Sequence, residues 1–378
     1  MTIKIIKALR EELEHPQQST RLGSGWISGL AALILALISF GIVISLRYPQ
    51  ILTSTEIRNF INTEYVHIGL YATLTIGFLL AAISMVLREK KIFGLTAVTL
   101  ILISSILAGV PVSQAAAQHQ PLIAFSLDWF MLNLVFTGIL FLPLERLFYR
   151  IPQATFRTEW REDLFYFFIS SVLVQTLTYL SMAPSNAIIL RIADAEFRTL
   201  ISSQAIWLQI IEIMILTDLV QYWVHRAFHR IPFLWGFHAV HHSAQKMDWL
   251  AGSRMHFIEI IGLRALTVIP MFVLGYSEIA IQIYLLIVYL YSTYIHANVR
   301  FDIEWLKPFI VTPRFHHWHH GVEKEAIDVN FAIHFPVLDK LFGTYFLPKG
   351  RWPQGYGVGG HPVPSGFIRQ FFYPFKKS

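Results

Sequence analysis

The sequence predicts an all-α, polytopic membrane helical bundle with a cytoplasmic helical cap that carries a histidine-rich dinuclear metal site. Of the 378 residues, 54% are hydrophobic and only 14% are charged, whereas ordinary soluble domains contain about 25% charged residues. The apolar residues fall into stretches of membrane-spanning length. Eleven of the sixteen histidines lie between His225 and His320, so the candidate chemistry is confined to the second half of the chain.

Eight apolar stretches are long enough to cross a bilayer, which takes about 20 helical residues. The last two are separated by only the four residues from Gly275 to Glu278, so we expect a tight helical hairpin. Glu259 lies near the start of its first arm, which leaves open whether that arm crosses fully. The predicted spans are Trp26–Leu46, His67–Leu87, Phe93–Val112, Leu122–Leu144, Asp163–Met182, Ala205–Val224, Phe257–Leu274 and Ile279–Ile295.

These stretches divide the chain into four expected regions. Residues 1–25 form a segment without a secretory signal pattern, and its apolar spacing at Ile6, Leu9 and Leu13 predicts a short helix on the membrane surface. The other regions are an accessory transmembrane region with the first four spans at 26–146, a histidine-bearing domain at 163–348, and a C-terminal cytoplasmic tail at 349–378.

The basic residues predict the orientation of the chain. They occur in short clusters beside apolar stretches rather than along one stripe, so we expect no nucleic-acid partner. If every span crosses, three clusters fall on one side, which the positive-inside rule makes the cytoplasm. If the remaining spans also cross, His225 and His296 lie on the same cytoplasmic side. We expect the membrane to be a bacterial inner membrane or the endoplasmic reticulum. The clusters are Lys4, Lys7, Arg10 and Arg21; Arg88, Lys90 and Lys91; and Arg146, Arg150, Arg157 and Arg161.

Three histidine boxes have the spacing of chelating arrays. Residues three and four positions apart share one helical face, so we expect each box to project its imidazoles toward one point. The chain has no cysteine, and imidazole suits zinc, copper, iron and nickel. Eight such ligands are too many for one tetrahedral ion, which predicts a dinuclear site. The expected ligands, which are also the expected catalytic residues, are His225, His229, His238, His241, His242, His316, His319 and His320.

The remaining histidines divide into neighbours of the boxes and isolated residues. His296 ends a long apolar stretch and His256 lies shortly after the second box, so both are candidate metal residues. His317 breaks the helical face of its box and is expected behind the ligands or at the surface, whereas His334 stays open. An ordinary structural role is expected for His15, His67, His119 and His361.

The boxes and the residues around them resemble the fatty acid hydroxylase and sterol desaturase superfamily of membrane di-iron oxygenases. The resemblance covers Asp218 to Tyr345, and the flanking residues look most like the branch that contains alkylglycerol monooxygenase and bacterial sterol desaturase-like proteins. The matching words are Asp218-Leu-Val-Gln-Tyr-Trp-Val-His225-Arg-Ala-Phe-His229, Trp235-Gly-Phe-His238-Ala-Val-His241-His242, Thr312-Pro-Arg-Phe-His316-His-Trp-His319-His320, Asn330-Phe-Ala and Leu338-Asp339-Lys-Leu-Phe-Gly-Thr344.

The resemblance implies two iron ions held by the eight box histidines and dioxygen as co-substrate. It implies hydroxylation of an unactivated C–H bond of a membrane lipid, such as a sterol, fatty acyl chain, sphingolipid or ether lipid, with desaturation as the alternative outcome of the same site. No donor domain is visible in the sequence, so the electrons are expected from a separate protein. The first four spans have no counterpart in the minimal family core, and their role stays open.

Two other classes of protein compete with this interpretation. A metal transporter would place ionisable ligands near the middle of the membrane, whereas these boxes follow the ends of spans. A zinc-dependent membrane hydrolase needs a carboxylate base, as in the HExxH pattern. None of the three boxes contains a glutamate, which favours oxygen chemistry.

Overall fold

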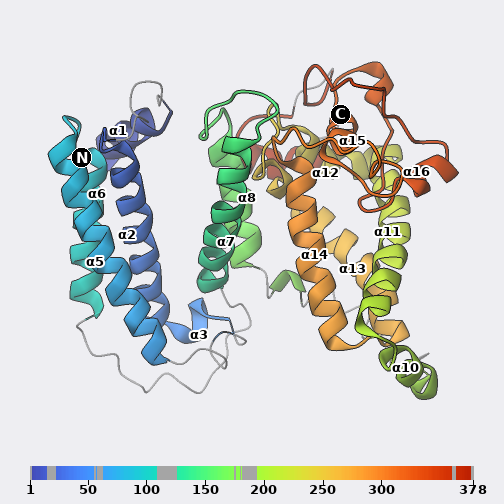
Figure 1. Ribbon diagram of the computed structural model, residues 1–378, viewed down its shortest axis with the longest axis horizontal. Helices are drawn as coiled ribbons and strands as arrows, with labels where there is room; N and C mark the ends of the chain where they lie inside the picture. The colour runs from blue at the N-terminus through green and yellow to red at the C-terminus, as the bar shows by residue number, and fades with distance from the viewer. Residues whose placement is uncertain are drawn as a thin grey trace. The chain divides into compact units, whose positions relative to one another are not determined.

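A computed structural model describes residues 2–14, 23–54, 57, 63–108, 126–173, 176–178, 180, 194–359 and 363–375. These residues form helices, with two isolated β-bridges and no β-sheet among them. The all-α prediction is therefore confirmed. The chain divides into two compact units, which Figure 1 draws without fixing their relative positions.

The first unit comprises Met1–Val135, Gln153–Arg157 and Ser171–Gln175. It contains α1 (Thr2–Glu14), α2 (Trp26–Arg47), α3 (Pro49–Leu52), α5 (Thr63–Leu87) and α6 (Ile92–Ala108). Helix α2 packs against both α5 and α6. The contact uses small residues, because a Cβ on Gly29 would lie 2.4 Å from Ser84 Oγ and Ala32 and Ala36 are fully buried. Small residues allow this close approach of apolar helices in a membrane.

Helix α1 shows that the start of the chain is helical, as expected, while its placement on the membrane surface stays a prediction. Its residues Leu9 and Leu13 pack on the cluster that contains Trp26 and Phe93. Trp26 Nε1 donates to the carbonyl oxygen of Glu12 at 3.2 Å, and the Glu12 carboxylate pairs with Arg88. These contacts hold α1 against the rest of the first unit.

The second unit comprises Phe136–Pro152, Thr158–Ser170 and Thr176–Ser378. Helices α11 and α13 lie side by side, α14 packs on α11, and α12 and α15 lie at one end of them (Figure 1). Helix α7 (Leu127–Leu147) ends in this unit. Its other elements are α8 (Trp160–Val172), α10 (Ala195–Ser202), α11 (Ile206–Arg230), α12 (Pro232–His242), η3 (Ala251–Ser253), α13 (Phe257–Leu274), α14 (Glu278–His296), α15 (Pro313–His319), η4 (Lys324–Ala326), α16 (Val337–Leu341), α17 (Phe367–Phe371) and η5 (Tyr373–Phe375).

The tight hairpin predicted between the last two spans is confirmed. Helix α13 ends at Leu274, and Gly275 caps it with φ of 79°, a left-handed conformation in which glycine carries no steric penalty. Helix α14 begins at Glu278, where the Ser277 side chain accepts a hydrogen bond from the backbone N–H of Ala280. Because the hairpin is short, α14 returns directly alongside α11 and brings His296 to the end that carries His225.

Two buried carboxylates hold the segment after α15, one from α11 and the other from α16 within that segment. Asp218 accepts backbone hydrogen bonds from Ile333 at 2.8 Å and Phe335 at 2.7 Å. Asp339 accepts from Phe331 and from Ala332, at 2.8 and 3.0 Å. A charge-assisted bond of this kind is stronger than a neutral one, so these side chains fix the backbone around Phe331 beside the last turns of α11.

Six described helices are long and apolar enough to cross a membrane, which is consistent with a multi-pass membrane protein. They are α2, α5, α7, α11, α13 and α14. The expected span Phe93–Val112 corresponds to α6, which reaches Ala108 within the described residues. The expected span Asp163–Met182 begins in α8, and part of it lies outside the described residues. The four regions proposed from the sequence stay predictions.

Candidate metal centre

The histidines of the three boxes come from the ends of helices that meet at one end of the second unit. His225 and His229 lie in the last two turns of α11, and the second box occupies the last two turns of α12. The third box forms most of α15, whose cap is His320. Thr312 begins this short helix, since its side chain accepts from the backbone N–H of Phe315.

The structure gathers nine histidines into two groups, each with nitrogen atoms within 4.8 Å of one another. All eight expected ligands belong to one group or the other, and His296 completes the second. The first group consists of His225, His229, His238, His242 and His319. The second group consists of His241, His296, His316 and His320.

The boxes do not coincide with the groups, which corrects the expectation that each box projects toward one point. The first box does contribute both histidines to the first group. In the second box, however, His241 and His242 belong to different groups, and so do His319 and His320 in the third. Successive residues of an α-helix are about 100° apart around the axis, so adjacent imidazoles face different points.

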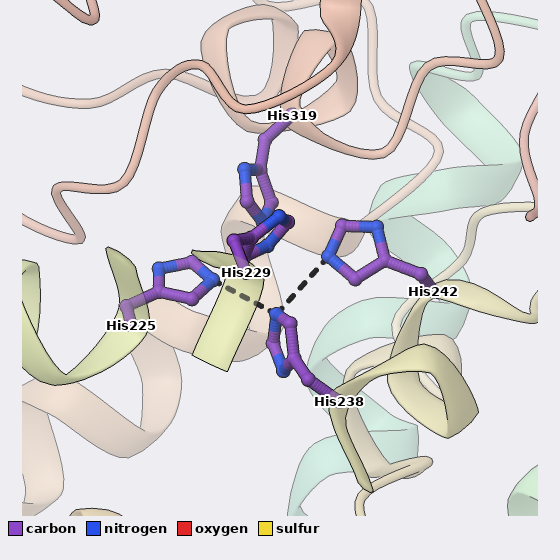
Figure 2. Close-up of side chains that lie close together, drawn as sticks. All are labelled: His225, His229, His238, His242 and His319. Atoms are coloured by element: carbon purple, nitrogen blue, oxygen red, sulfur yellow. Dashed lines mark hydrogen bonds between the residues drawn. The ribbon is translucent and has the colours of Figure 1, made fainter. Parts of the chain in front are cut away.

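Within each group the Nε2 atoms point inward. His238 Nε2 lies 3.0 Å from Nε2 of His225 and 3.1 Å from Nε2 of His242, and Figure 2 shows the five rings of the first group turned toward one another. In the second group, His296 Nε2 lies 3.2 Å from His241 Nε2 and 2.9 Å from His316 Nε2. Nitrogen ligands at about 2.1 Å from one ion are separated by about 3.0 to 3.4 Å, so both groups match the spacing around a single ion.

Six of the outer Nδ1 atoms are held by backbone carbonyls or by carboxyl groups. In the first group, Nδ1 of His225 donates to the carbonyl oxygen of Phe331 at 2.9 Å, and Nδ1 of His319 donates to that of Val329 at 2.8 Å. Nδ1 of His238 lies 2.5 Å from a carboxyl oxygen of Glu259. A bond at the outer nitrogen fixes the tautomer and the direction of the ring, as it does for histidine ligands in general.

The contact between His241 and His296 tests whether the groups suit a metal. Nδ1 of each ring faces a backbone carbonyl, of Arg254 at 3.1 Å and of Ser292 at 2.7 Å. A carbonyl oxygen only accepts, so each Nδ1 carries the hydrogen and each neutral ring has a lone pair on Nε2. Two lone pairs at 3.2 Å repel each other unless a cation lies between them, and the residues therefore fit a metal ion.

Burial keeps the imidazoles of the second and third boxes neutral. The pKa of each lies well below its ordinary value, because the protein removes the charged ring from water and neighbouring histidines add like charge. This holds for His238, His241, His242, His316, His319 and His320. Since a metal binds the deprotonated nitrogen, these six side chains are in the form that coordinates at neutral pH.

Three other candidates lie outside both groups. His317 is buried, and it donates through Nε2 to the carbonyl oxygen of His296 at 3.3 Å and accepts through Nδ1 from Tyr356 at 2.8 Å. Both nitrogens of His256 are also engaged, one by the carbonyl oxygen of Phe371 and the other by a backbone N–H of α13. His256 therefore does not join either group in this structure, and its role as a metal residue stays a prediction. His334 packs against Tyr284 and Tyr291 and belongs to neither group.

Two carboxylates behind the rings had no assigned role in the sequence. Glu259 contacts His238, and Asp328 lies 3.4 Å from Nδ1 of His229. The sequence could have indicated a role for Glu259, because an acidic residue in the first turn of an apolar span is costly unless it has a partner. For Asp328 no local pattern was available, since its φ of 59° and its position depend on the loop after the third box.

Known proteins are similar to this chain in the region that contains the two histidine groups. The family model described as fatty acid hydroxylase matches residues 210–344, which contain all nine histidines of the two groups. A putative methylsterol monooxygenase of Dictyostelium discoideum is 31% identical over 209 residues, which are 54% of this chain and 75% of that protein. No solved structure matches the chain.

Two further relatives match over shorter parts. An ornithine lipid hydroxylase of Rhizobium tropici is 29% identical over 170 residues, covering 45% of this chain and 51% of the relative. The human alkylglycerol monooxygenase is 28% identical over 153 residues, covering 39% of this chain and 32% of the relative. The match thus spans about half or less of the length of these two relatives.

Proposed function

Because this chain belongs to the fatty acid hydroxylase family, we propose that it is a membrane enzyme that hydroxylates an unactivated C–H bond of a lipid with dioxygen and two iron ions. The observation that carries the proposal is the pair of buried histidine groups with inward Nε2 atoms. The names of the relatives all denote lipid substrates, namely an ornithine lipid, an alkylglycerol and a methylsterol. The candidate classes remain sterol, fatty acyl, sphingolipid and ether lipid.

The two histidine groups are proposed to hold one iron ion each. The choice of iron rests on the family, because imidazole ligands bind zinc at least as well. When bound, the iron pair supplies the activation of dioxygen for oxidation of the C–H bond. The chain itself orients the rings through their Nδ1 atoms, keeps the box imidazoles neutral and buries them away from water. The two electrons are proposed to come from a separate donor protein.

The rival functions fit these contacts less well. A hydrolase needs a carboxylate that reaches metal-bound water, yet the contacts of Glu259 and Asp328 are with the outer Nδ1 atoms of His238 and His229. A transporter would hold its ion along a path through the membrane. Here the histidines lie in the last turns of α11 and at the end of α14.

The reaction is tested with labelled dioxygen. Membranes that contain the protein, supplied with iron, a reducing partner and ¹⁸O₂, are expected to form a lipid that carries one ¹⁸O atom, as measured by lipid mass spectrometry. Desaturation would instead leave the product unlabelled and place the label in water. Product formation that continues at the same rate without oxygen would exclude both reactions.

The metal centre is proposed to face the cytoplasm. The arginine-rich loop after α7 lies beside it, because the backbone N–H of Arg150 donates to the carbonyl oxygen of Asn298 at 3.1 Å, two residues after His296. The C-terminal segment is attached to the first turn of α8, which follows this loop, since Gln370 donates to Glu162 at 3.0 Å. A reporter fused after Ser378 is therefore expected to give a cytoplasmic signal. A signal from the opposite side would contradict this orientation.

A further inference from the structure

The two histidine groups differ in the chemistry that supports their outer nitrogens. In the second group, His241 and His296 bond to backbone carbonyls, and Nδ1 of His316 and of His320 has no hydrogen-bond partner among the described residues. In the first group, by contrast, two of the five rings face carboxylates, Glu259 and Asp328. Carboxyl groups therefore lie behind two rings of the first group, whereas the partners found among the described residues for the outer nitrogens of the second group are backbone carbonyls.

Glu259 is the more constrained of the two carboxylates. It lies in the first turn of α13, which begins at the His256 cap, and its side chain is buried. Its Oε1 lies 2.5 Å from His238 Nδ1, while its Oε2 has no partner among the described residues. Burying a carboxyl group without a full set of partners costs free energy. We therefore expect the contact of Glu259 with one ring of the metal centre to have a function.

A carboxylate at Nδ1 has two effects on a histidine ligand. It holds the hydrogen on Nδ1, which leaves the Nε2 lone pair free for the metal, and it makes that lone pair more basic. His238 Nε2 is central in the first group, since it is within 3.1 Å of both His225 Nε2 and His242 Nε2. A change in the basicity of this ring therefore acts directly on the first metal position.

We propose that Glu259 is a positioning residue for His238 that makes the two metal positions unequal, with the first group binding its ion more tightly. The inference rests on the proposed metal pair and adds that the two ions have different affinities and different electronic environments. Asp328, which also pairs with Arg230 at 3.3 Å, supports His229 in the same group. In the second group, the described partners are the backbone carbonyls that hold His241 and His296.

The test compares wild-type protein with Glu259→Gln, which keeps the shape of the side chain and replaces its carboxyl group by an amide. Both are loaded with ⁵⁷Fe, and the iron is removed stepwise with a chelator while Mössbauer spectra are recorded. Wild type is expected to show two iron environments that are lost at different chelator concentrations. In Glu259→Gln the tighter ion is expected to bind about 10- to 100-fold more weakly, with a changed signal, while the other ion keeps its signal and affinity.

A matched control removes a carboxylate that does not contact the histidines. Glu212 bonds to Tyr276 at 3.1 Å and to Gln204 at 3.3 Å, so Glu212→Gln is expected to leave both iron signals unchanged. If Glu259→Gln does not accumulate, Asp328→Asn is tested in its place and is likewise expected to weaken binding of the tighter ion. Equal weakening of both ions, or no change in either, would overturn the inference. A wild-type protein that binds fewer than two iron ions would instead overturn the proposed function.

Discussion

Replacing His241 by alanine is expected to reduce lipid oxidation to the background of membranes without the protein and to lower the iron content. His241 is one of four rings in the second group, and its Nε2 lies 3.2 Å from that of His296. The removal of one ring leaves three histidines and a buried space where the imidazole was. Product formation by mass spectrometry and iron per chain in the purified protein measure the two effects. His238→Ala is expected to do the same to the first group.

His317→Ala is the matched control, because His317 is also a buried histidine of a box. Its nitrogens contact Tyr356 and the backbone of His296 rather than another ring of either group. The variant is expected to keep its iron and to lose less activity than His241→Ala. Full activity with two bound iron ions in purified His241→Ala would remove His241 from the ligand set. Equal iron loss in His317→Ala would show that the assignment of the third box is wrong.

Replacing Asp163 by alanine is expected to lower the free energy of unfolding by about 1.5 to 3 kcal/mol, since it removes a buried hydrogen bond between charged groups. Arg254 keeps its ion pair with Glu159 at 3.4 Å. Asp163 and Arg254 have fully buried side chains, and Arg254 Nε donates to Asp163 at 2.5 Å. The carbonyl oxygen of Arg254 also accepts from His241 Nδ1. The change is therefore expected to weaken the second metal position as well. Thermal unfolding in detergent, with iron content as a second measurement, tests this expectation.

Two further variants make the test specific. The side chain of Glu304 is exposed where it pairs with Lys307. Glu304→Ala is therefore expected to leave the unfolding temperature unchanged. The double change Asp163→Leu with Arg254→Met removes both charges and is expected to be less destabilising than Asp163→Ala alone. An Asp163→Ala protein as stable as wild type would show that the pair contributes little to the fold.

Apolar length and local spacing were sufficient to predict much of the architecture. The all-α class and the hairpin at Gly275 follow from the hydropathy of the chain and the short connection between two apolar stretches. The spacing of the three boxes identified eight histidines, all of which the structure places in the two groups. These predictions succeed because helix periodicity and capping depend on residues a few positions apart.

The spacing of the boxes thus predicted eight of the histidines that gather, and contacts between distant helices divide them into two groups. His241 and His242 are adjacent in the chain, yet they face different groups because each meets rings from other helices. His256 follows shortly after the second box, but the start of α13 and the C-terminal segment engage both of its nitrogens. Glu259 reaches His238 only because α13 packs beside α12. Such contacts join residues far apart in the chain, where local periodicity carries no information.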